Sequence, residues 1–277
     1  MYNQQQEKNM IETIPGLYIA DRGTKFKTLV TSVLKRGIKK QKYLDILTDE
    51  QGMEVFSAAF TSELVDPLQN FQVLEQLGDL SANKFIVMYL YRRFPQLKCA
   101  EGVKVAARLR INFGSKQSFF KIAEDLGFWE FISATNDLRQ RKMKALLEDV
   151  FEAFLGAVET IFDDRVKMGL GYSVVYKILE NIFDEISISL AYESLYDAKT
   201  RLKELFDLHG EKLGPLVYKE DKNELLTTST VYRVDGGKYE VRPNGSINFN
   251  KIIGGKYHKI GEGKAALKAD MSSLVRS

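Results

Sequence analysis

Acidic side chains at helical spacing are the residues of this sequence best suited to chemistry. In VLEQLGDLS (73–81), Glu75 and Asp79 stand four residues apart within an apolar run. In LLEDVFEAFLGAV (146–158), Asp149 and Glu152 stand three apart. Residues at these spacings share one face of a helix. Like charges on a face that continues into apolar residues are costly when a second helix covers them, so something must offset their repulsion.

A divalent cation is one solution. Small residues lie within or just after both acidic pairs and would let the two helices approach closely: Gly78, Ser81, Ala82, Ala153 and Gly156. Crossing there would bring four carboxylates together, and oxygen-only ligands suit Mg²⁺, Mn²⁺ or Ca²⁺. The alternative is two separate helices whose acids are partly solvated.

Composition narrows the chemistry further. The sequence has only two histidines, His209 and His258, and one cysteine, Cys99. Because histidine is the usual general base near neutral pH, carboxylates or lysines with a bound metal are better candidates, and a zinc site is disfavoured. A lone cysteine excludes an internal disulfide and favours an intracellular, cytoplasmic location. No apolar stretch reaches the roughly 18 residues that would cross a membrane.

The elements that must position these acids are helices. Apolar residues recur at three-to-four spacing from Thr24 to about Ser189. After a polar lead-in at 1–22, we predict a mostly α domain at 23–189, a linker at 190–196 and a small α+β domain at 197–277. The last domain is predicted as α-β-β-β-α, because Val, Thr, Tyr and Ile runs with Gly and Asn turns follow one helix. Its small basic excess is compatible with nucleic acid or with an ordinary solvated surface.

The segment NFQVLEQLGDLSANKFIVMYLYRRFP (70–95) resembles the signature of the ribonuclease III family, whose core reads L-E-aromatic-L-G-D. The segments AEG (100–102), RLRINF, QSFFKIAEDLGF and LLEDVFEAFLGAV follow in the family's order. DAKTRLKELF and GEGKAALKAD resemble parts of a double-stranded-RNA-binding domain. The resemblance covers about residues 24–277.

This resemblance implies a Mg²⁺-dependent endoribonuclease that acts as a homodimer on double-stranded RNA, with Mn²⁺ as a substitute. Products would carry 5′-phosphate and 3′-hydroxyl ends. The metal ligands would be Glu75, Asp79, Asp149 and Glu152, with Asp79 and Glu152 catalytic. Glu101 matches a further acid of the cleavage centre, close to an insertion of about two residues.

The sequence departs from the family at three places. Gln72 stands where another Glu is usual, although an amide can still ligate or bind RNA. Gln76 replaces the aromatic ring that packs into the partner subunit in the family, which weakens the case for the usual dimer contact. In the last domain, Ala266 and Leu267 replace two lysines.

RNA contacts are expected at Thr200 and Glu204, which match positions that reach a minor groove, and at Lys264 and Lys268. The alternative for each of them is an ordinary surface residue. The departures leave two other functions open: a non-catalytic RNA-binding or structural protein on the same fold, and a processing enzyme that relies on a partner to bring its RNA.

Overall fold

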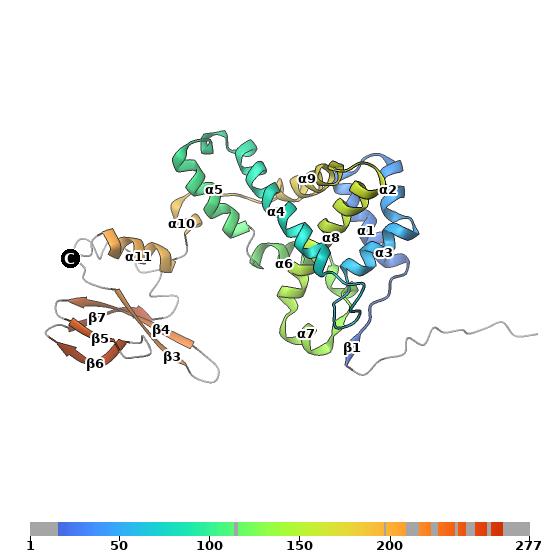
Figure 1. The fold of residues 1–277 in the computed structure, drawn as a ribbon. Coiled ribbons are helices and arrows are strands. Elements are labelled where there is room, and N and C mark those ends of the chain that lie inside the picture. Colours follow the sequence, from blue (N-terminus) through green and yellow to red (C-terminus); the bar gives the residue numbers. More distant parts are fainter. Residues whose placement is uncertain are drawn as a thin grey trace, which may run out of the picture. The chain divides into compact units, whose positions relative to one another are not determined.

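The computed structural model describes residues 16–113, 116–196 and 198–208, and the strand residues 216–222, 227–235, 238–241, 247–253 and 256–262. The chain forms two compact units, Met1–Ile188 and Ser189–Ser277. Each unit is described by itself (Figure 1).

Unit 1 is helical, which confirms the predicted mostly α domain. Its elements are β1 (Leu17–Tyr18), α1 (Thr24–Gly37), α2 (Gln41–Thr48), α3 (Glu50–Ala59), α4 (Gln72–Arg93), η1 (Pro95–Leu97), α5 (Ala100–Phe113), α6 (Lys116–Asp125), η2 (Phe128–Phe131), β2 (Ala134–Thr135), α7 (Asn136–Arg141), α8 (Met143–Arg165) and α9 (Leu170–Phe183). Helix α3 ends at Ala59, and just beyond it Thr61 forms a bridge with Ser133.

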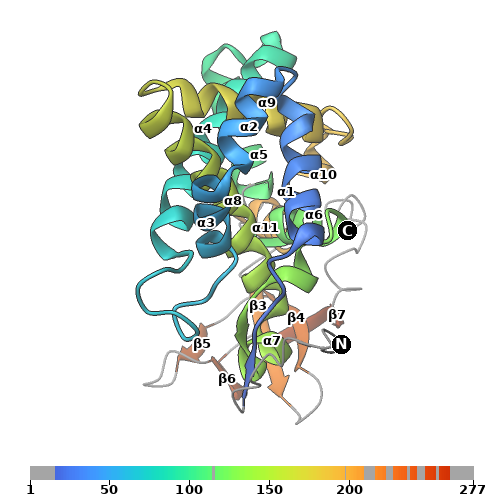
Figure 2. The same cartoon turned by 90° about the vertical axis from the view of Figure 1, so that its right-hand side faces the viewer.

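Helix α8 is the centre of this unit. Every residue from Val150 to Val158 is buried, so the helix is enclosed on all sides rather than amphipathic. Helices α3, α4, α6 and α9 pack around it (Figures 1 and 2). Any polar side chain that α8 carries in this stretch must therefore be accommodated inside the unit.

Helices α4 and α8 cross at two glycines. A Cβ atom added to Gly78 would lie 1.8 Å from the carbonyl oxygen of Glu152, and one added to Gly156 would lie 2.0 Å from the carbonyl oxygen of Leu74. Each backbone thus fills the space that a side chain would need on the other helix. The close approach predicted from these small residues is confirmed.

Arg22 fastens the segment after β1 to the helical body. Its guanidinium donates hydrogen bonds to the carbonyl oxygens of Phe60 and Phe131 and to the hydroxyl of Ser133. These acceptors belong to the chain after α3 and to the segment around β2. One cation therefore holds together three stretches that are far apart in sequence.

Arg139 of α7 also holds distant segments of unit 1 together. Its guanidinium carbon lies 3.9 Å from the ring centroid of Tyr18 and 3.9 Å from that of Trp129. It also donates to the carbonyl oxygens of Trp129 and Ile132. Stacking against two rings, with the donors satisfied, fixes β1 against η2 and α7.

Unit 2 differs from the predicted α-β-β-β-α order. Its described residues form α10 (Tyr192–Leu195), α11 (Ala198–Leu208) and five strands where three were predicted: β3 (Leu216–Lys222), β4 (Thr227–Asp235), β5 (Lys238–Val241), β6 (Ile247–Ile253) and β7 (Lys256–Glu262). The strands pair antiparallel in the orders β3-β4-β7 and β5-β6. The Thr- and Tyr-rich stretch from 227 to 253 alone contains three of these strands, β4, β5 and β6.

The predicted last helix, with Lys264 and Lys268, lies outside the described residues. Of the helices that are described, none combines the length and the apolar character that crossing a bilayer requires.

Candidate functional site

Helix α4 builds one wall of an acidic pocket. Phe71, which precedes α4, is buried and anchors the start of the helix. On the next turns of α4, polar side chains at three-to-four spacing face the pocket. The pocket has a volume of about 590 Å³ and is lined by Gln72, Val73, Glu75, Gln76, Asp79 and Glu152. Glu75 and Asp79 therefore face the same space, as their four-residue spacing indicates.

Helix α8 supplies Glu152 from the opposite wall. Its side chain is buried, with 7% of the residue exposed. Burial, together with the nearby charges of Asp79, Glu148, Glu75 and Asp149, raises the pKa of Glu152 to about 9; burial has the largest effect, and the charges follow in that order. The charges of the other three predicted ligands thus raise the pKa of Glu152. All four acids therefore share one electrostatic environment.

Asn83 is a polar neighbour of Asp79 that the sequence analysis did not single out. Its side-chain amide donates to Asp79 Oδ1 at 2.6 Å and to the Asp79 main-chain oxygen at 3.0 Å. The signal that could have found it is the same periodicity that links Glu75 to Asp79. The next residue in that series is position 83.

Glu148 is the other polar residue missed by the sequence analysis. It is 5% exposed and lies one turn before Glu152 on α8. Its charge contributes to the raised pKa of Glu152. The four-residue spacing of these two glutamates could have drawn attention to it.

The remaining predicted residues of the cleavage centre lie differently. Asp149 is half-buried on α8 and does not line the pocket, although its charge acts on Glu152. Glu101, on α5, is exposed and forms an ion pair with Lys104 at 3.3 Å. Glu101 does not line this pocket either. Gln72 does line it, so the substituted amide stays beside the acids.

The donor set fits a hard divalent cation in its chemistry. All candidate ligands are oxygens, and one of them is a buried carboxylate surrounded by like charge, an arrangement that a cation would relieve. In the part of the chain that the structure describes, however, no three acidic, histidine or cysteine side chains are arranged to hold a metal ion. The described arrangement therefore brings three of the acids to one pocket without converging them on a single point.

Two of the four predicted RNA contacts lie on α11. Thr200 and Glu204 are one turn apart on this helix. The carboxylate of Glu204 accepts a hydrogen bond from the hydroxyl of Tyr192, which belongs to α10. Tyr192 also stacks against Tyr196, with ring centroids 5.0 Å apart. The segment predicted as a linker thus contains a short helix that contacts α11.

Comparisons with known proteins identify a family that this chain resembles. The family model described as "Ribonuclease III domain" matches residues 72–160, which include α4 and most of α8. A protein named "Putative ribonuclease 3" in Invertebrate iridescent virus 6 is 40% identical over 240 residues, covering 82% of each chain.

Two other similarities are shorter or weaker. The protein of the same name in Frog virus 3 (isolate Goorha) is 45% identical over 177 residues, covering 63% of this chain and 47% of its own. The solved nuclease domain of ribonuclease III from Campylobacter jejuni is 23% identical, with a TM-score of 0.42, over 58% of this chain and 97% of that domain.

Proposed function

We propose that this chain, which belongs to the ribonuclease III family, cleaves double-stranded RNA in a Mg²⁺-dependent reaction at the pocket between α4 and α8. As a member, it is a ribonuclease III-type endoribonuclease. The observation that carries the metal-dependent proposal is the buried, charge-crowded Glu152 facing Asp79. Products would carry 5′-phosphate and 3′-hydroxyl ends.

The metal site would use the acids of both helices. Glu75, Asp79, Asp149 and Glu152 would hold Mg²⁺ or Mn²⁺, with Gln72 and Glu101 as possible additional residues. When bound, the ion would supply activation of water and stabilisation of the charge that develops on the phosphate. The protein's own contribution is to hold Asp79 and Glu152 on opposite walls, where α4 and α8 cannot separate without opening the glycine contact.

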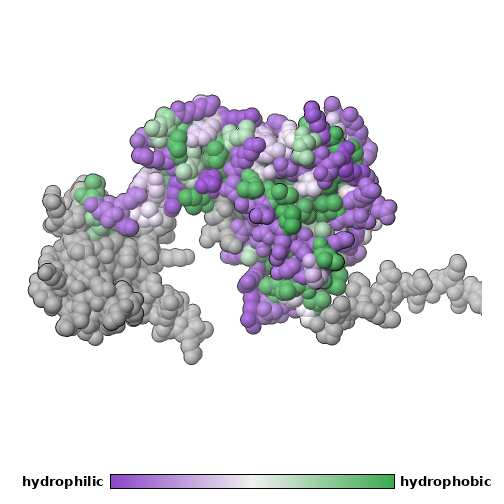
Figure 3. Space-filling model, viewed as in Figure 1, coloured by the Kyte–Doolittle hydropathy of each residue, from purple (hydrophilic) through white to green (hydrophobic). Residues whose placement is uncertain are grey.

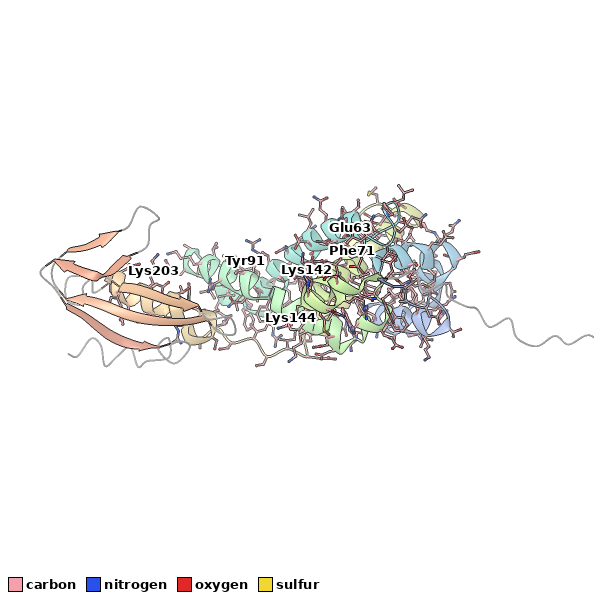
Figure 4. The ribbon with its side chains drawn as sticks, turned by 90° about the horizontal axis from the view of Figure 1, so that it is seen from below. Glu63, Phe71, Tyr91, Lys142, Lys144 and Lys203 are labelled. Atoms are coloured by element: carbon pink, nitrogen blue, oxygen red, sulfur yellow. The ribbon has the colours of Figure 1, made fainter. Side chains whose placement is uncertain are left out.

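Basic side chains on the same helix as two of the acids support an RNA substrate. Lys142 and Lys144 lie at the N-terminal end of α8 (Figure 4) and are exposed. Asp149 and Glu152 follow five to ten residues later, which corresponds to about 8–15 Å along a helix. Cations at this distance could bind backbone phosphates while the acids act on another. Unit 2 would provide a second set of contacts with the RNA duplex, through Thr200, Glu204, Lys264 and Lys268.

A homodimer is part of the proposal. The exposed residues of α4 next to the pocket include Val73, Leu77 and Leu80, which are 69%, 42% and 63% exposed. Apolar residues also gather over α4 on the molecular surface (Figure 3). Exposed apolar residues that follow one helix face mark a protein contact. They supply an apolar face where Gln76 does not supply the family's aromatic ring.

The test is cleavage of long duplex RNA by the purified protein in the presence of Mg²⁺. We expect cutting that chelation abolishes and that Asp79→Asn or Glu152→Gln reduces about 100-fold or more, since each change removes a charge at the reacting centre. The product ends should accept a 5′ label only after phosphatase treatment.

Two results would contradict the proposal. Tight duplex binding without metal-dependent cleavage would instead support a non-catalytic RNA-binding protein on this fold. Cleavage that both carboxylate variants retain at full rate would place the reaction elsewhere. A Glu63→Gln variant serves as a control, because Glu63 lies in the segment before α4 (Figure 4) and does not line the pocket.

A further inference from the structure

Asn83 contacts Asp79 in a way that goes beyond helix geometry. Its amide nitrogen donates both to the main-chain oxygen of Asp79 and to the carboxylate oxygen Oδ1. We propose that Asn83 is a positioning residue, which fixes the Asp79 carboxylate so that its second oxygen is available for a divalent cation. This inference rests on the proposed metal-dependent function.

The ordinary explanation for such an asparagine is a local bond to its own helix. Polar side chains often donate to the carbonyl oxygen four residues earlier. Asn181 of α9 does only that, donating to the carbonyl oxygen of Lys177 at 2.8 Å. Asn83 makes the same bond and adds a shorter one to a carboxylate that lines the acidic pocket. The added bond is therefore the feature that needs a functional account.

Asn83 contacts the carboxylate of Asp79, which is the strongest electrostatic neighbour of Glu152. Of the charges around Glu152, that of Asp79 has the strongest effect. An amide N–H donated to one oxygen limits rotation of the Asp79 side chain and partly offsets its charge. Partners that orient a ligand in this way commonly contribute 10- to 100-fold to metal affinity.

The test measures Mn²⁺ binding to the full chain by calorimetry, so that its readout does not depend on cleavage. For Asn83→Ala we expect Mn²⁺ affinity to fall about 10-fold or more. Asn83→Leu, which keeps the side-chain size and favours a helix, should show the same loss. The matched control Asn181→Ala removes an equivalent helix bond away from the pocket and should bind Mn²⁺ as the wild type does.

A double-mutant cycle shows whether Asn83 acts through Asp79. In an Asp79→Asn background, Asn83→Ala should cause no further loss. If Asn83→Ala and Asn83→Leu bind Mn²⁺ with wild-type affinity while Asp79→Asn binds more weakly, this inference is wrong and the proposed metal site stands. If wild type and Asp79→Asn bind Mn²⁺ equally, or neither binds, both the site and the inference are wrong.

Discussion

At the scale of single residues, Glu152 has the environment that most needs a ligand. Its carboxyl group is buried, and four other acids act on it. Without a cation its raised pKa, about 9, keeps the group protonated at neutral pH. The metal-free protein therefore avoids the repulsion by holding a proton there.

This raised pKa predicts how the stability of the metal-free protein depends on pH. The folded state holds a proton on Glu152 that the unfolded state releases above its ordinary pKa of 4.5. Stability therefore falls as pH rises from the ordinary pKa towards 9. Relative to Glu152→Gln, the wild type should lose at most about 1.4 kcal/mol for each pH unit in this window.

Urea denaturation in chelator at several pH values measures that difference. A constant difference between wild type and Glu152→Gln from pH 5 to pH 9 would contradict the prediction, because it would mean that Glu152 titrates normally. Adding Mg²⁺ should stabilise the wild type more at high pH, since ligation requires the ionised carboxylate.

Some of this site follows from the sequence and some does not. The spacing of Glu75 and Asp79 predicts that both side chains lie on one face of a helix. Whether Glu152 shares their pocket was left open, because it depends on how the two helices cross. The burial of Glu148 could not be predicted from residue spacing, because it depends on which helices cover α8 on that side. The contact of Asn83 with Asp79 depends on a rotamer, which residue spacing leaves open.

At the scale of elements, the crossing of α4 and α8 determines where the acids lie. Glu152 and Gly156 are one turn apart, and the Glu152 carbonyl oxygen is the atom that Gly78 contacts. The backbone contact and the carboxylate therefore belong to the same turn of α8. Moving the helices apart at Gly78 would displace Glu152 from the wall that it forms.

Gly78→Ala is expected to destabilise the protein by about 3 kcal/mol or more. The added methyl group would overlap a buried backbone oxygen, which cannot move aside as a flexible side chain can. Urea denaturation measures the loss. Gly23→Ala is a suitable control, because its Cβ would approach only the Asp21 side chain. A loss below about 0.5 kcal/mol for Gly78→Ala would mean that the helices separate easily.

The helices were easier to predict than the strands for a physical reason. A helix such as α8 contains its own hydrogen bonds, so local periodicity and small residues describe it well. Strands β4 and β7 pair although residues 236–255 separate them in the chain, and local composition does not contain that pairing. The short α7 was also missed, since its six residues are too few to show a period.

At the scale of the whole molecule, the exposed apolar face of α4 predicts the oligomeric state. Leu77→Glu would place a charge within this face beside Val73 and Leu80. We expect it to convert a dimer into a monomer of 31.6 kDa, because burying an unpaired charge in a contact is costly. Size-exclusion chromatography with light scattering measures the mass directly.

The control for this experiment is another exposed leucine. Leu208, at the end of α11 in unit 2, is 77% exposed and lies on a different unit. Leu208→Glu should leave the mass unchanged. If Leu77→Glu remains a dimer, or if the wild type is already a monomer, the face formed by Val73, Leu77 and Leu80 is not the dimer contact.

The stacking of Arg139 on Trp129 has a practical consequence. Trp129 is the one tryptophan in the sequence, so intrinsic fluorescence excited selectively in this ring comes from a single position. That position is the corner where β1, η2 and α7 meet. A change in its emission would report the release of this corner from the helical body. The protein thus carries a built-in optical reporter of local opening, and no label is needed to observe it.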